Sequence, residues 1–515
     1  MQKSYTKNYV KIYFWQFLSI LLNLLSLFIV IPQLSSQPGI YGIYSICVSA
    51  VIFLSYADLG FLNAGFKYAS EAYAQGKKEE EQKVIGFVSF ILALFVLVFA
   101  GCIITLSFHP GWLIKNLDGE SNIRTARMLL LTLALFSPNV ILQRALMVIF
   151  GVRLEDYIYQ RFQILINISK IASVFYFFRS GHYDIVGYFL FCQAITTLGL
   201  IAAFFTSGKR YSITLLSFLR SLRFSRQLYN EVKNLALSTF ALTISWILYY
   251  ELDVYAIAKL SGAQAVAYYS IGLTCLSFFR TIFGTLFNPF TARFNHFIAL
   301  NDEQGLKQLY QTVLSIMLPL VVFPILSVVF LSRPFVFNWV GANFAESVPV
   351  VILLTLCNVL GFISYPSSIL LIARREIRSL YYLAAVQPLI FWIGILLTFP
   401  HMGYVSFAYF KLIAFLISSV FYLNVSFKVL NVGFLEFLNK VIKPAVLPVL
   451  LLSIALYFLA GYLPLEKNKF KLLLTIATGG ITAGICLVVY YFTSSMFRLY
   501  VKNIYSRFSA NISTK

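Results

Sequence analysis

The chain has 515 residues, of which 60% are hydrophobic and only 11% are charged. A water-soluble domain usually carries about 25% charged residues, so this composition excludes an ordinary soluble protein and predicts one that buries its apolar surface in a bilayer. The formal net charge of +21 would suit a partner of nucleic acid, but the basic residues lie between apolar runs, which argues against that function.

About fourteen apolar runs follow one another along the chain, each long enough to cross roughly 30 Å of hydrocarbon as a helix of about 20 residues. The runs are 10–33, 41–64, 84–108, 125–150, 158–179, 184–206, 234–259, 265–289, 311–331, 347–372, 379–399, 403–428, 444–463 and 471–493. Backbone groups in lipid must be hydrogen-bonded within the segment, and the short alternating strands of a barrel are absent. The sequence therefore predicts an all-α polytopic membrane protein.

The basic residues predict which side of the membrane each connection occupies. With the N-terminus in the cytoplasm, 29 of the 40 Lys and Arg residues fall in cytoplasmic connections and 9 in the opposite ones, while Lys170 and Lys411 lie inside spans. This positive-inside bias predicts that both termini are cytoplasmic.

The longest polar connection, 207–233, separates two similar halves. The expected organisation is a six-helix lobe over 1–206, a basic amphipathic linker over 207–233, a second six-helix lobe over 234–428, and two further helices with a tail over 429–515. Tyr44-Ser45-Ile46 is echoed 225 residues later by Tyr269-Ser270-Ile271. An even number of helices per repeat predicts a pseudo-two-fold axis along the membrane normal, an arrangement of transporters with a site between the halves.

Three basic residues are expected to line a wet, cationic cavity. Lys170, Arg280 and Lys411 lie too deep in their spans to reach the surface easily, and a charge at that depth is costly unless it faces water or a partner. Arg144 lies nearer a span end, where snorkelling is the alternative to a binding role.

Polar residues recur at helical spacing on one face of several spans. Those expected to line the lumen are Gln16, Asn23, Gln163, Asn167 and Asn288. Helix–helix packing through interhelical hydrogen bonds is the alternative explanation for each.

Three acids are candidates for coupling transport to an ion. Asp58, Glu251 and Asp253 lie at or near membrane depth, where a carboxylate can carry a proton or bind Na⁺. An ion pair with a residue such as Lys259, or exposure at the interface, is the alternative.

Motifs for nucleotide hydrolysis and metal binding are missing. The chain has no G-x-x-x-x-G-K-[ST] and no H-E-x-x-H, and its six cysteines all fall in predicted spans without metal-ligand spacing. The sequence therefore predicts that the protein is not an enzyme and that it holds no metal or cofactor.

Two stretches resemble polysaccharide biosynthesis proteins, the Wzx-type flippases of the multidrug/oligosaccharidyl-lipid/polysaccharide exporter superfamily. Residues 41–72 carry the first match and residues 252–294 the second. The matching features are Tyr41-Gly42, Asp58-Leu59-Gly60, Asp253, Gly262, Tyr268 or Tyr269, and Pro289. The acid-rich first helix of some drug-exporting relatives is absent, which argues against a drug/cation exchanger.

The resemblance implies a flippase that moves a polyprenyl-pyrophosphate-linked oligosaccharide, such as an O-antigen or capsule unit, from the cytoplasmic to the outer leaflet of the bacterial inner membrane by alternating access. It also implies membrane lipids, polysaccharide polymerases and glycosyltransferases as partners. A cationic cavity suits a pyrophosphate. A small-molecule or drug exporter of the same superfamily, and a membrane polymerase or glycosyltransferase, are the alternatives, and short outward loops argue against the enzyme.

Overall fold

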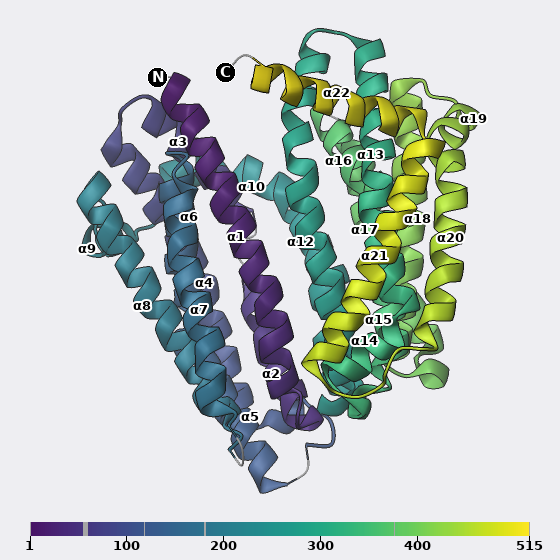
Figure 1. Ribbon diagram of the computed structural model, residues 1–515. Helices are drawn as coiled ribbons and strands as arrows, with labels where there is room; N and C mark the ends of the chain where they lie inside the picture. Colours follow the sequence, from purple (N-terminus) through teal and green to yellow (C-terminus); the bar gives the residue numbers. More distant parts are fainter. Residues whose placement is uncertain (1, 55–59, 118, 180–181, 375, 514–515) are drawn as a thin grey trace. The chain divides into compact units, whose positions relative to one another are not determined.

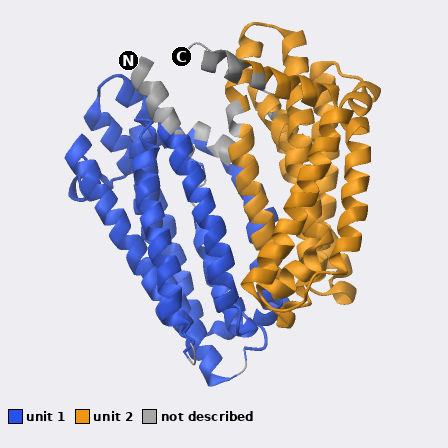
Figure 2. Cartoon of the chain, in the orientation of Figure 1, with its two compact units in different colours: residues 1–267 blue, residues 268–515 orange. Residues whose placement is uncertain are grey.

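The computed structural model describes residues 2–54, 60–117, 119–179, 182–374 and 376–513, and within these ranges the secondary structure is helical, with turns and no strand (Figure 1). The chain divides into two compact units, residues 1–267 and residues 268–515 (Figure 2).

Unit 1 is built mainly from long helices joined by short turns. Its elements are α1 (Gln2–Leu34), α2 (Pro38–Leu54), α3 (Phe61–Ala74), α4 (Lys78–Phe108), η1 (Pro110–Trp112), α5 (Glu120–Phe136), α6 (Asn139–Gly151), α7 (Asp156–Phe177), α8 (Ile185–Tyr211), α9 (Leu215–Ser221), α10 (Arg226–Trp246), the π-helical η2 (Ile247–Glu251) and α11 (Asp253–Ser261). α12 (Ala263–Ala299) begins in unit 1 and continues into unit 2. α1 packs along α7, which packs along α8.

Unit 2 contains the rest of α12 and the C-terminal helices. They are α13 (Glu303–Phe330), α14 (Ser332–Trp339), η3 (Ala342–Phe344), α15 (Ser347–Leu356), α16 (Gly361–Ala373), α17 (Ile377–Met402), α18 (Val405–Leu430), α19 (Phe434–Phe437), the π-helical η4 (Leu438–Ile442), α20 (Lys443–Ala460), α21 (Lys469–Thr493) and α22 (Ser495–Ser513). α20 and α21 pack on α13, where Tyr490 is fully buried and its hydroxyl donates to the carbonyl of Ser315 at 2.9 Å. α20 and α21 are thus part of the core of unit 2.

Ten helices of the described residues are long and apolar enough to cross a membrane, or eleven if the pair α15 and α16, bent by 41°, forms one span. The expectation of an all-α polytopic membrane protein is confirmed, with fewer qualifying spans than the roughly fourteen predicted. The predicted runs fall mainly on helices, but 158–179 carries several polar residues and 234–259 is broken by the π-helical turn of η2. The run 41–64 continues past α2 into residues 55–59, which lie outside the described residues.

The order of helices in the first half of the chain recurs in the second. α2 begins at Pro38 and α12 at Ala263, while α4 begins at Lys78 and α13 at Glu303, so both pairs are 225 residues apart, the offset of the sequence echo. The turn before α4 contains Gly76 at φ 73°, and the turn before α13 contains Asn301 at φ 54°. A left-handed residue stops a helix, and glycine and asparagine adopt that conformation at least cost. The boundaries of the four predicted segments and the pseudo-two-fold axis remain predictions.

Candidate functional site

The polar faces of α1 and α7 meet in unit 1. Asn167 donates from Nδ2 to Oδ1 of Asn23 at 3.0 Å, and this hydrogen bond joins two helices that are far apart in the sequence. Gln16, also on α1, is half-buried. A polar pair between lipid-embedded helices stabilises their association by about 0.6–2 kcal/mol. Helix–helix association therefore explains the Asn23–Asn167 hydrogen bond equally as well as a role in lining a lumen does.

A second polar group lies nearer the start of α7. Gln163 donates from Nε2 to the hydroxyl of the buried Tyr159 at 2.7 Å, and Gln143 and Arg144 of α6 lie beside the same hydroxyl. The Nη1 atom of Arg144 is 4.0 Å from the sulfur of Met147. Arg144 thus belongs to a polar contact between α6 and α7 and is only half-buried.

Lys170 continues the polar face of α7. It follows Asn167 by three residues, or about one helical turn, and lies beside the thiol of Cys192 in α8. Tyr44 and Tyr188 lie near that thiol, and their ring centroids are 6.4 Å apart. The Lys170 side chain is half-buried. A cation can bind an anion, and tyrosines can offer ring faces and hydroxyls to a sugar.

Two buried acids lie where α10 gives way to α11. Glu251 is 7% exposed and ends the π-helical turn, while Asp253 is fully buried and accepts a hydrogen bond from the backbone N–H of Val254 at 2.8 Å. Tyr255 lies near both acids, and its buried hydroxyl has no hydrogen-bond partner among the described residues. π-helical turns often occur at functional sites. Of the other candidates, Asp58 and the side chain of Asn288 lie outside the described residues.

The remaining cations belong to unit 2. Lys411 in α18 is fully buried, and its Nζ is 5.4 Å from the ring centroid of Phe391 in α17. Arg280 in α12 is half-buried, and its backbone carbonyl accepts a hydrogen bond from the Tyr365 hydroxyl at 3.3 Å. Burying a charged ammonium group costs free energy unless hydrogen bonds or nearby charges replace its contacts with water. The buried surroundings of Lys411 must therefore supply such partners. That these two residues share a cavity with Lys170 remains a prediction.

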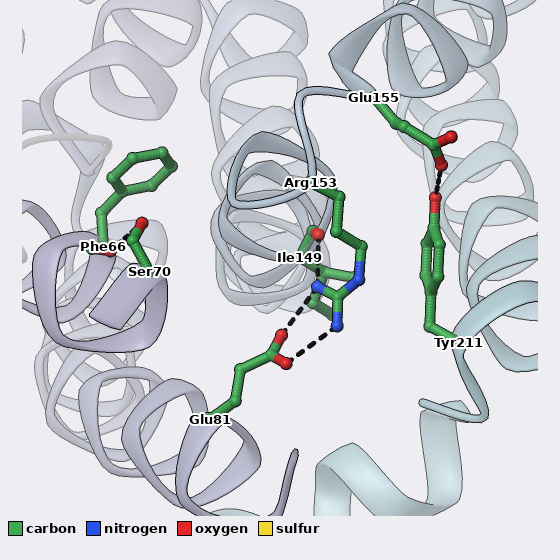
Figure 3. Close-up of polar contacts among 7 residues, drawn as sticks. All are labelled: Phe66, Ser70, Glu81, Ile149, Arg153, Glu155 and Tyr211. Atoms are coloured by element: carbon green, nitrogen blue, oxygen red, sulfur yellow. Dashed lines mark hydrogen bonds and ion pairs between the residues drawn. The ribbon is translucent and has the colours of Figure 1, made fainter. Parts of the chain in front are cut away.

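Sequence reasoning missed a buried ion pair in unit 1. Arg153, just after α6, pairs with Glu81 of α4 at 2.7 Å, and the two side chains are 7% and 2% exposed (Figure 3). The guanidinium also donates to the carbonyl of Ile149 at 2.7 Å and lies 4.8 Å from the ring centroid of Tyr73 and 4.6 Å from that of Tyr211. Both charges lie in predicted cytoplasmic connections, so the sequence offered only a topological explanation for them.

Unit 2 has an ion pair between the corresponding elements. Glu303, in the first turn of α13, pairs with Arg374, the residue that follows α16. The Glu303 side chain is 62% exposed, in contrast to Glu81. Among the described residues, no group of three or more His, Cys, Asp or Glu side chains gathers as a metal site would require.

No model of a protein family matches the chain, and no curated protein matches its sequence. Solved structures match its fold. A lipid II flippase, MurJ, in an inward closed conformation aligns with a TM-score of 0.62 and 15% identity over 94% of this chain and 99% of that one. An inward-facing multidrug resistance MATE family transporter of the MOP superfamily aligns with a TM-score of 0.60 and 14% identity over 79% and 94%.

A MOP superfamily transporter from Pyrococcus furiosus aligns with a TM-score of 0.57 and 13% identity, over 83% of this chain and 96% of that one. Identities this low establish the fold alone. The chain therefore has the fold of MOP superfamily transporters, as the resemblance of residues 41–72 and 252–294 implied, while its Wzx-type character and its cargo are matters for proposal.

Proposed function

We propose that the protein is a flippase for a polyprenyl-pyrophosphate-linked oligosaccharide, moving it between the leaflets by alternating access. The observation that carries this proposal is the fold similarity to a lipid II flippase, which extends over 94% of this chain and 99% of that one. The alignment with the multidrug resistance transporter extends over 79% of this chain. The longer alignment favours lipid-linked cargo.

The side chains of Lys170, Arg280 and Lys411 would hold the pyrophosphate, with Arg144 in support. Cationic side chains in a site of low dielectric bind phosphate strongly. Tyr44 and Tyr188, near the Cys192 thiol, would contact the sugar through their rings and hydroxyls. The polar residues Gln16, Asn23, Gln163, Asn167 and Asn288 would complete the lumen.

Glu251 or Asp253 would couple transport to an ion, with Asp58 as a further candidate. The two buried acids beside Tyr255 form a group that can exchange a proton or hold Na⁺. The proposed setting is the bacterial inner membrane, with both termini cytoplasmic and with polysaccharide polymerases and glycosyltransferases acting on the same glycan.

Reconstitution into proteoliposomes tests this function. A lipid-linked oligosaccharide is placed in both leaflets, and the fraction open to an external glycosidase is followed with time. A flippase exposes the inner-leaflet pool, whereas empty liposomes leave that pool protected. Export of a cationic dye without movement of the glycan lipid would instead identify a drug exporter, which the multidrug transporter folds make the second candidate.

The cationic residues are tested in the same assay. Lys170→Met, Arg280→Met and Lys411→Met should each slow glycan exposure roughly tenfold or more, because each removes a charge-assisted hydrogen bond to the pyrophosphate. Lys259→Met, at an exposed position in α11, should retain the normal rate. Unfolding temperatures separate loss of binding from loss of fold. Full activity of all three variants would refute the cationic site.

A further inference from the structure

Three cations gather around one tyrosine in unit 1. Tyr157 lies in the first turn of α7 and is buried. Lys11 of α1 places its Nζ 5.1 Å from the Tyr157 ring centroid, and Arg161 of α7 places its guanidinium 5.4 Å from the same centroid. Arg210, near the end of α8, lies beside the Tyr157 side chain. Three helices thus contribute one cation each.

A second aromatic ring orients the exposed guanidinium. Arg161 lies 4.7 Å from the ring centroid of Trp15, so it contacts one aromatic residue on each of α1 and α7. Cation–π contacts of this kind hold a guanidinium in a defined plane, with its N–H donors able to turn toward a ligand. Arg161 remains exposed despite both contacts.

Two acids lie near this group, and one of them, Glu155, pairs with Arg210. Glu155 accepts a hydrogen bond from the Tyr211 hydroxyl, as Figure 3 shows, and lies 3.7 Å from Arg210. Asp156 lies against Gly151 of α6, since a Cβ atom added to Gly151 would be 3.3 Å from the Oδ1 atom of Asp156. Within the described part of the chain, Lys11 and Arg161 form no ion pair with a carboxylate. The group therefore retains positive charge for an outside anion.

The position of the group along the helices matches the surface of a bilayer. Lys11 is the first residue of the candidate span Lys11–Leu34, and Arg210 is the last residue but one of the span Ile185–Tyr211. Beside Lys11, the side chains of Phe14 and Phe17 are 60% and 67% exposed, as expected of a helix face turned to lipid. Tryptophan, tyrosine and basic residues are enriched at this level, where phosphates of lipids lie.

We propose that Lys11, Arg161 and Arg210, held by Trp15 and Tyr157, form a binding site for the headgroup of an anionic phospholipid. The phosphate accepts hydrogen bonds from the guanidinium of Arg161 and the ammonium of Lys11, while the acyl chains lie along the exposed face of α1. This site is separate from the proposed cargo cations, and it does not depend on the transported substrate.

Binding to the purified full-length protein tests the site. The probes are dioleoylphosphatidylglycerol, dioleoylphosphatidylcholine and inorganic phosphate, each titrated in detergent and followed by native mass spectrometry and unfolding temperature. The wild-type protein should bind the anionic lipid roughly fivefold more tightly than the zwitterionic one, or better. Equal affinity for the two lipids, or equal stabilisation by inorganic phosphate, would overturn the lipid site.

Matched variants locate the binding. Arg161→Gln and Lys11→Gln should each weaken binding of the anionic lipid roughly fivefold or more, and Arg161→Lys should weaken it less. Lys209→Gln is the control, because Lys209 is an exposed cation of the same α8 terminus that lies against the Phe205 ring instead, 4.5 Å from its centroid. Unfolding temperatures without lipid identify any misfolded variant. A loss with Lys209→Gln as large as with Arg161→Gln would show diffuse surface attraction and refute the site.

Discussion

Replacing Glu81 by glutamine should destabilise unit 1 strongly. The change leaves the Arg153 guanidinium buried without its counter-charge, since the Glu81 and Arg153 side chains are 2% and 7% exposed and their closest atoms are 2.7 Å apart. Breaking one partner of a buried ion pair costs about 3–5 kcal/mol. At about 2–4 °C per kcal/mol for a unit of this size, the unfolding temperature in detergent should fall by at least roughly 6 °C.

The pair in unit 2 provides a control within the same protein. Glu303→Gln removes the same charge from a carboxylate that is 62% exposed, so solvent screening should limit the cost to about 0–1 kcal/mol. The assay is thermal unfolding of both purified variants, followed by intrinsic fluorescence in the same detergent. If Glu81→Gln and Glu303→Gln lower the unfolding temperature equally, burial does not make the Glu81–Arg153 pair more costly to break than the Glu303–Arg374 pair, and the reasoning is refuted.

Three further predictions concern packing. Gly42→Ala should reduce the abundance and unfolding temperature of the protein, because an added Cβ would lie 1.8 Å from a backbone carbonyl oxygen at the start of α12, whereas Gly39→Ala, with nothing within 4 Å, should be tolerated. Asn167→Ala should cost about 0.6–2 kcal/mol, and adding Asn23→Ala should cost little more, because both variants remove the same 3.0 Å hydrogen bond; additive losses would contradict this pairing. Tyr490→Phe should cost about 1 kcal/mol by removing its 2.9 Å hydrogen bond, and an unchanged unfolding temperature would show that the bond contributes nothing.

Much of the fold could be predicted from the sequence because each spanning helix satisfies its own backbone. The runs 84–108 and 311–331 correspond to α4 and α13, and Gly76 and Asn301 lie at the turns that precede them. The break in 234–259 could not be predicted, because the π-helical turn at 247–251 carries no proline or glycine. The sequence therefore locates apolar helices better than their interruptions.

The candidate site was accessible to sequence reasoning only in part. Helical spacing placed Asn23 and Asn167 on polar faces of their own helices, yet the hydrogen bond between them depends on how α1 packs against α7. Lys411 was singled out by its depth, but its contact with the Phe391 ring depends on the packing of α17 and α18. The ion pair between Glu81 and Arg153 had no local signal, since its partners are 72 residues apart.

The sequence by itself determined that this protein lies in a membrane as a set of helices, because length, apolarity and backbone hydrogen bonding act within each segment. Only the tertiary structure decided which polar side chains meet, because those contacts join helices distant in the chain. Lys11, Arg161 and Arg210 show the difference: each is an ordinary basic residue in the sequence, and the packing of α1, α7 and α8 brings them to one tyrosine side chain.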